Sequence, residues 1–111
     1  MEFNTNVKFT DTDKYIGHPL VIETEQGSKY IFTVIKKHRR AVCAMYVVLL
    51  KYKTINCDYN IKEVSICNRY VPTIFSKDSL MGIKNLRTPT IEEYKRYKAI
   101  LRKYIIYYKW K

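Results

Sequence analysis

The stretch Leu20-Val-Ile-Glu-Thr-Glu-Gln-Gly-Ser-Lys-Tyr-Ile-Phe-Thr-Val-Ile35 decides the fold. Two apolar runs rich in β-branched residues, 20–24 and 30–35, flank a polar segment that contains Gly27, one of only three glycines. This pattern predicts a β-hairpin with its turn at residues 25–28, because glycine adopts the backbone angles that tight turns require. Alternate residues of the second run lie on opposite faces, as in a strand. We therefore expect an antiparallel sheet.

Further strands are expected on both sides of this hairpin. The polar N-terminal segment has the pattern of one short strand at residues 7–10. Residues 41–50, the most apolar stretch, suit a buried helix or a central strand by length, and their valines favour the strand. Residues 51–60 are expected to be a hairpin connection, and two more strands follow at 61–70 and 71–75.

The clearest local signal is a helix start at Thr88-Pro-Thr-Ile-Glu-Glu-Tyr94. With Thr90 as the N-cap, Glu93 is the third helical residue and completes a capping box, so the helix begins at Ile91. At 100° per residue, six apolar or aromatic side chains lie within an arc of about 140°. They are Tyr94, Tyr97, Ile100, Leu101, Tyr104 and Ile105. No glycine or proline follows, so residues 104–110 either continue the helix or form a strand.

These elements predict a single α+β domain over residues 1–111. Its fold is expected to be a small antiparallel β-sheet, or an SH3-like half-barrel, followed by one C-terminal amphipathic helix. The β part is expected at about 7–75, a connection with one helical turn (77–81) at 76–89, and the helix with its tail at 90–111.

No apolar run approaches the roughly 18 residues of a membrane span, and the N-terminus lacks an apolar signal core. A cytoplasmic protein without a membrane partner is expected. Cys43, Cys57 and Cys67 form no CxxC pair, so we expect free thiols and no metal. The sequence contains neither GxGxxG nor GxxxxGK(S/T), so we expect no cofactor.

The net charge of +11 predicts an anionic partner, and this charge is unevenly distributed. Residues 1–35 carry a net charge of −2, residues 36–83 carry +6, and residues 84–111 carry +7. Two basic elements account for much of the excess: Lys36, Lys37, Arg39 and Arg40 in one, and Lys95, Arg96, Lys98, Arg102 and Lys103 on the helix in the other. Either element could contact phosphates or simply be a solvated surface.

Aromatic side chains near these cations could stack on unpaired bases, and the alternative for each of them is packing in the core. The candidates are Tyr52, Tyr59, Tyr70, Tyr107 and Trp110.

The segment Leu86-Arg-Thr-Pro-Thr-Ile-Glu-Glu-Tyr94 resembles a closing motif of small phage accessory proteins, in which a short SH3-like β-domain is followed by a capped helix. The match consists of Leu86, Arg87, Thr90, Glu92 and Glu93. The chain departs from the motif at Ile91, where the motif usually has proline, and it has no glycine after the helix. The resemblance implies an accessory factor that blocks host machinery, including nucleic-acid-based defences (an anti-CRISPR-like role).

No set of acid, base and nucleophile can be assembled, so no enzyme activity is expected. Asp11 and Asp13 have the pattern of turn or cap residues. His38 lies among cations and could serve as the base in RNA cleavage, which would make the protein a small ribonuclease. The leading expectation is a non-enzymatic inhibitor that binds nucleic acid or a host nucleoprotein complex through its basic, tyrosine-rich surface. The alternative is a protein–protein inhibitor or homodimer, with Tyr107, Tyr108 and Trp110 at its interface and the charge directed at an acidic surface.

Overall fold

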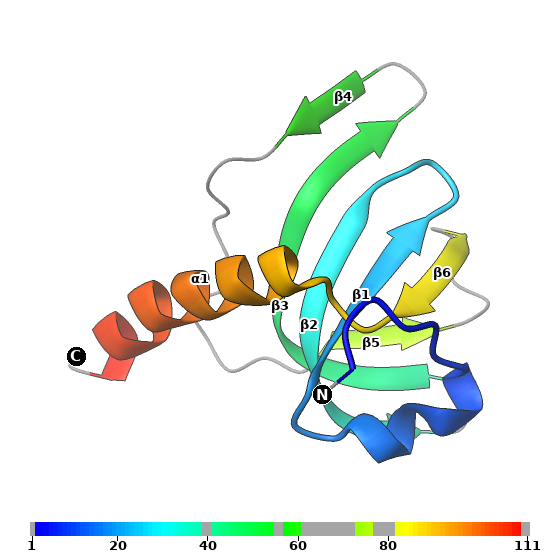
Figure 1. The fold of residues 1–111 in the computed structure, drawn as a ribbon, viewed down its shortest axis with the longest axis horizontal. Helices are drawn as coiled ribbons and strands as arrows, with labels where there is room; N and C mark the ends of the chain where they lie inside the picture. Colours follow the sequence, from blue (N-terminus) through cyan, green and yellow to red (C-terminus); the bar gives the residue numbers. More distant parts are fainter. Residues whose placement is uncertain (1, 39–40, 55–56, 61–72, 77–81, 110–111) are drawn as a thin grey trace.

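The computed structural model describes residues 2–38, 41–54, 57–60, 73–76 and 82–109, with the backbone alone at 38, 52–54, 57–60, 73–76 and 104–109. Its elements are the 3-10 helix η1 (Phe9–Tyr15), the strands β1 (Pro19–Thr24), β2 (Lys29–His38), β3 (Ala41–Thr54), β4 (Cys57–Asn60), β5 (Thr73–Ser76) and β6 (Ile83–Arg87), and the helix α1 (Ile91–Lys109). Figure 1 shows how the strands curve around one another while α1 leaves the sheet beside β2.

All described strand pairs are antiparallel, in the order β4-β3-β2-β1-β6, and β5 pairs with the first residues of β3. The predicted α+β fold, a small antiparallel sheet followed by one C-terminal helix, is therefore confirmed. The hairpin turn is also where the sequence predicts it. Gly27 has a φ of 98°, and its N–H donates to the carbonyl of Thr24 at 2.9 Å.

The sheet has a hydrophobic core on each face, because its strands place successive side chains on opposite sides. The first core contains Val7, Leu20, Ile22, Phe32, Val34, Val42, Ala44 and Leu86, and Phe9 and Tyr15 of η1 pack against it. The second core contains Val21, Ile31, Val48, Leu50 and Tyr97, and Ile100 and Leu101 of α1 pack against it. The sheet is thus covered by η1 on one face and by α1 on the other.

A bulge lets β3 contribute to both cores. Strict alternation would put Val48 on the same face as Val42, but the two belong to opposite cores. The register explains this difference: Ile31 pairs with Val48 and Thr33 pairs with Met45, so β3 has one residue more than β2 between these pairs. Tyr46 lies within the bulge and has a φ of 52°.

Three sequence predictions were wrong. Residues 7–10 do not form a strand: η1 begins at Phe9, and the hydroxyl of Thr12 donates to the Phe9 carbonyl at 2.8 Å, a local bond that competes with strand pairing. Residues 51–60 are not only a connection, because β3 continues to Thr54 and pairs with β4.

The third error is the predicted connection at 76–89, which contains β6. This strand pairs with β1 on one side. On its other side the N-terminal segment approaches, with an Asn6–Arg87 bridge and a hydrogen bond of 2.9 Å from the Val7 N–H to the Leu86 carbonyl. The predicted strand at 61–70 and the helical turn at 77–81 lie outside the described residues, whereas β5 confirms a short strand near 71–75.

The C-terminal helix begins at Ile91 as predicted and ends at Lys109, so the strand alternative for residues 104–109 is wrong. On the predicted apolar face, Tyr97 is buried, and Ile100 and Leu101 are half-buried. None of the helices in the described part of the chain has the length and apolarity that crossing a membrane requires.

Candidate nucleic-acid interface

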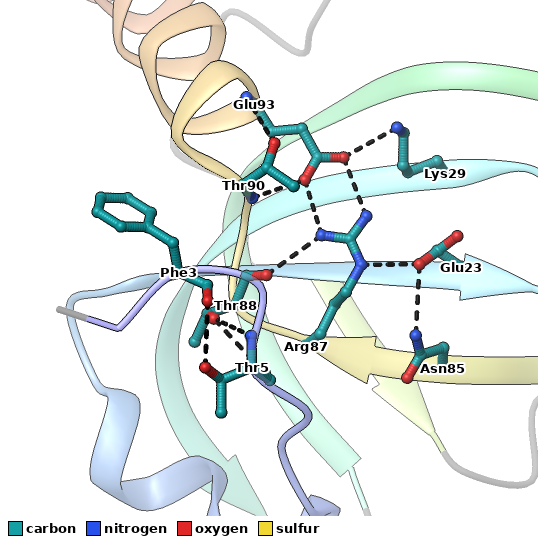
Figure 2. A network of polar contacts seen from close by, with 9 residues as sticks. All are labelled: Phe3, Thr5, Glu23, Lys29, Asn85, Arg87, Thr88, Thr90 and Glu93. Carbon is teal, nitrogen blue, oxygen red and sulfur yellow. Dashed lines mark hydrogen bonds and ion pairs between the residues drawn. The ribbon is translucent and has the colours of Figure 1, made fainter.

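Four charged side chains fix the start of α1 to the sheet, and we call them the Arg87 cluster: Glu23, Lys29, Arg87 and Glu93. Arg87 at the end of β6 binds Glu93 of α1 through two hydrogen bonds, Nη1 to Oε1 at 2.7 Å and Nη2 to Oε2 at 3.0 Å. Its Nε donates to Glu23 of β1 at 2.7 Å, and Lys29 of β2 contacts Glu93 at 2.8 Å. Figure 2 shows how these side chains connect three strands to the helix.

The Arg87–Glu93 pair is largely shielded from water: the two side chains are only 9% and 11% exposed. Burial alone would raise the pKa of Glu93, but hydrogen bonds from Arg87, Lys29 and the Thr90 N–H lower it to about 2. The hydrogen bond from Arg87 also lowers the pKa of Glu23, against the effect of burial. Two cations thus face two carboxylates, so the cluster adds no net charge to the surface.

The predicted capping box is present in full. The Glu93 N–H donates to the Thr90 hydroxyl at 3.1 Å, and the Thr90 N–H donates to the Glu93 carboxylate at 2.8 Å. Glu93 therefore both caps its own helix and binds Arg87. Because one carboxylate serves both contacts, the capping signal in the sequence also marks the point where the helix is attached.

Tyr97 makes the second attachment, one turn further along α1. Its hydroxyl donates to the carbonyl of Tyr46 in the β3 bulge at 2.9 Å and lies 2.8 Å from the hydroxyl of Thr33. A phenol has one proton, so Thr33 must be the donor in the second bond. Burial raises the pKa of Tyr97, so its hydroxyl stays protonated and keeps this bond.

With one side of α1 attached at two points, the opposite side is available to a ligand. Lys95, Lys98 and Arg102 are exposed there, and at 100° per residue they lie within about 60° of Ile91. We call these three residues the cationic stripe. From first to last residue, the stripe spans about 10 Å of helix axis. In the described part of the chain, Lys95 and Arg102 form no ion pair.

Two aromatic rings lie beside the cationic stripe. The rings of Phe3 and Tyr94 meet edge to face, with centroids 5.9 Å apart and an interplanar angle of 69°. The ammonium of Lys98 lies 5.2 Å from the centroid of Tyr94. Sequence reasoning missed this grouping: it assigned Tyr94 to the apolar helix face and gave Phe3 no role.

The remaining predicted helix cations, Arg96 and Lys103, are exposed on the other flank of the helix, about 100° or more from the centre of the stripe. The structure therefore divides the five predicted cations of the helix between two sides. Tyr107 and Tyr108 belong to the last turn of α1, of which the structure gives the backbone, and Trp110 lies outside the described residues.

The two described residues of the first predicted basic element lie near the opposite end of β2 from the helix. Lys36 is exposed and Lys37 half-buried near the end of β2, where the Lys37 ammonium donates to the Thr10 carbonyl of η1 at 3.3 Å. The helix contacts the other end of the same strand, through Lys29. Lys36 is seven positions after Lys29, which corresponds to roughly 20 Å of strand, so Lys36 is well separated from the strand end that the helix contacts. Arg39 and Arg40 lie outside the described residues.

The structure describes the side chains of Asp11 and Asp13 among the candidate catalytic residues. Asp11 and Asp13 both belong to η1, where Asp11 forms an exposed pair with Lys14 at 3.5 Å. His38 ends β2, and its side chain is not among those described. Within the described residues, no three His, Cys, Asp or Glu side chains are grouped so as to hold a metal ion.

No family model matches the chain, and no curated protein or solved structure is significantly similar to it. What can be said of the function therefore depends on the geometry of the site.

Proposed function

We propose that this protein is a non-enzymatic nucleic-acid-binding factor that uses the cationic stripe of α1 to contact phosphates. The observation that carries the proposal is the exposure of Lys95, Lys98 and Arg102 on one side of a helix whose other side is fixed by Glu93 and Tyr97. Because the helix is already fixed, its cations bind a phosphate chain without a further loss of backbone freedom. The helix carboxylate nearest the sheet, Glu93, is already paired with Arg87 and does not repel the ligand.

The mechanism is steric occupation. A protein of 111 residues with a net charge of +11 that covers a stretch of backbone prevents another protein from using it. This fits the role implied by the phage-type closing motif at Leu86–Tyr94, an inhibitor of a host nucleoprotein complex.

The test is the salt dependence of binding. Each phosphate that the protein neutralises releases counterions, and this release becomes less favourable as salt is added. Raising the salt concentration from 50 to 200 mM therefore lowers the affinity about threefold for each phosphate contact. Three contacts from the stripe therefore account for a loss of about 30-fold. The combined substitution of Lys95, Lys98 and Arg102 by Ala is expected to remove this part of the dependence without unfolding the protein, because all three side chains are exposed.

A matched control replaces Lys8, Lys14 and Lys84 by Ala, which removes the same charge from exposed positions away from the helix. This control should keep most of the affinity. Equal losses in the two triple variants would show that net charge alone attracts the ligand. Binding to a nuclease-treated host protein that is unaffected by the stripe substitutions would favour the protein–protein alternative instead.

A further inference from the structure

An aromatic side chain is held at the surface next to the cationic stripe. The side chain of Phe3 comes from the opposite end of the chain to α1, yet its ring contacts Tyr94 of the helix. Phe3 remains 39% exposed, although the protein has two hydrophobic cores that could have received it. Phe3 therefore presents part of an aromatic ring to solvent next to a tyrosine that contacts a cation of the stripe.

The backbone that follows Phe3 is fixed by two hydrogen bonds to the segment before α1. The Asn4 N–H donates to the Pro89 carbonyl at 2.9 Å, and the Thr5 N–H donates to the Thr88 hydroxyl at 2.8 Å. Asn4 has a φ of 51°, a left-handed conformation that asparagine adopts more readily than most residues. Figure 2 shows the result: the Phe3 ring projects away from Thr5 and from the Arg87 cluster.

We infer that Phe3, supported by Tyr94 and Lys98, is a stacking platform for one unpaired base, so that the ligand of the cationic stripe is a single strand. This inference rests on the proposed function. Lys98 already lies against the Tyr94 ring, which leaves the Phe3 ring as the aromatic surface for the base. Lys95, Lys98 and Arg102 then contact the phosphates of the same strand.

A double helix does not fit this arrangement equally well. Its phosphates could reach the stripe, but its bases are stacked on one another and cannot offer a face to Phe3. Single strands expose both phosphates and base faces, and aromatic stacking contributes to the binding of any base. We therefore expect a preference for single strands with little dependence on sequence.

The experiment compares three fluorescent probes of equal length at low salt: a single-stranded oligothymidine, a DNA duplex, and an abasic single strand with the same phosphates. The untagged protein is expected to bind the oligothymidine most tightly. Phe3→Leu keeps an apolar side chain against Tyr94 but removes the aromatic face. It should weaken oligothymidine binding about tenfold and leave binding of the abasic strand unchanged.

Two further variants separate stacking from structure. Phe3→Trp keeps an aromatic face and should restore the affinity for oligothymidine. Ile16→Ala changes an apolar side chain that is 53% exposed elsewhere on the surface, and should have no effect. Equal affinity for all three probes, or an equal loss on all of them in Phe3→Leu, would overturn the stacking platform while leaving phosphate binding intact. A protein that binds none of the probes would refute the proposed function as well.

Discussion

Arg87 and Glu93 form a bidentate ion pair, with N–O distances of 2.7 and 3.0 Å. The first residue ends β6 and the second lies in the first turn of α1, so this pair spans the junction between sheet and helix. The direction in which α1 leaves the sheet, and with it the position of the cationic stripe, depends on this contact.

Glu93→Gln should destabilise the protein by about 3 kcal/mol, because it leaves a buried guanidinium with only part of its carboxylate partners. Chemical denaturation measures this loss. Glu92→Gln makes the same change of charge at the neighbouring exposed position and should alter the free energy of unfolding by less than about 0.5 kcal/mol. Similar effects of the two substitutions would mean that the Arg87 cluster does not hold the helix.

Acid should weaken the protein through Glu93. Its pKa of about 2 in the folded state lies below the ordinary value of 4.5, so the charged form is favoured by folding. The stabilisation is present above about pH 5 and is lost as the pH falls towards 2, by about 3 kcal/mol in total. Denaturation curves between pH 6 and pH 2.5 should show this fall. In Glu93→Gln the fall should be much smaller; an equally steep fall in that variant would assign the effect to other carboxylates.

Tyr97→Phe should cost about 1.5 kcal/mol, because it removes the donor to the Tyr46 carbonyl and the acceptor for Thr33 within a buried site. Tyr94→Phe is the matched control, as its hydroxyl makes no hydrogen bond within the described residues. The substitution Thr33→Val, combined with Tyr97→Phe in a double-mutant cycle, should show coupling between the two hydroxyls. Additive effects would contradict the shared hydrogen bond.

Thr90→Ala should cost about 1 kcal/mol, since the Glu93 N–H loses its capping hydroxyl. Thr90→Ser should recover most of that loss, because serine supplies the same oxygen. Thermal unfolding of both variants, with Thr10→Ala at an exposed position as the control, measures the effect. A Ser variant as unstable as the Ala variant would show that the methyl group, and not the cap, is what matters.

Local patterns explain why part of this fold could be predicted from the sequence. The β1–β2 turn depends on residues within it, and the start of α1 depends on Thr90 and Glu93, which are three positions apart. β6 could not be recognised in the same way. It has few apolar residues, and its partners are β1 and the N-terminal segment, which are far away in the sequence. The bulge at Tyr46 likewise follows from packing on both faces of the sheet.

In the candidate site, too, the features that depend on nearby residues could be predicted, and those that depend on distant segments could not. The exposure of Lys95, Lys98 and Arg102 follows from helical periodicity, so the sequence could predict the stripe. The contact between Phe3 and Tyr94 requires the N-terminal segment to lie along residues 86–89, which no local pattern indicates. Nucleic-acid binding by these residues stays a prediction, which the binding of the three oligonucleotide probes tests.

The hydrogen bond between Thr5 and Thr88 joins residues that are 83 positions apart, and this separation affects the order in which parts of the protein fold during synthesis. β1 and β2 can pair as soon as both have left the ribosome, since a short turn joins them. The N-terminal segment has no edge to lie on until β6 has emerged, and closing so long a loop is slow. We expect it to dock late, together with the first turn of α1. A nascent chain would therefore form the contact between Phe3 and Tyr94 only after both β6 and the first turn of α1 have left the ribosome.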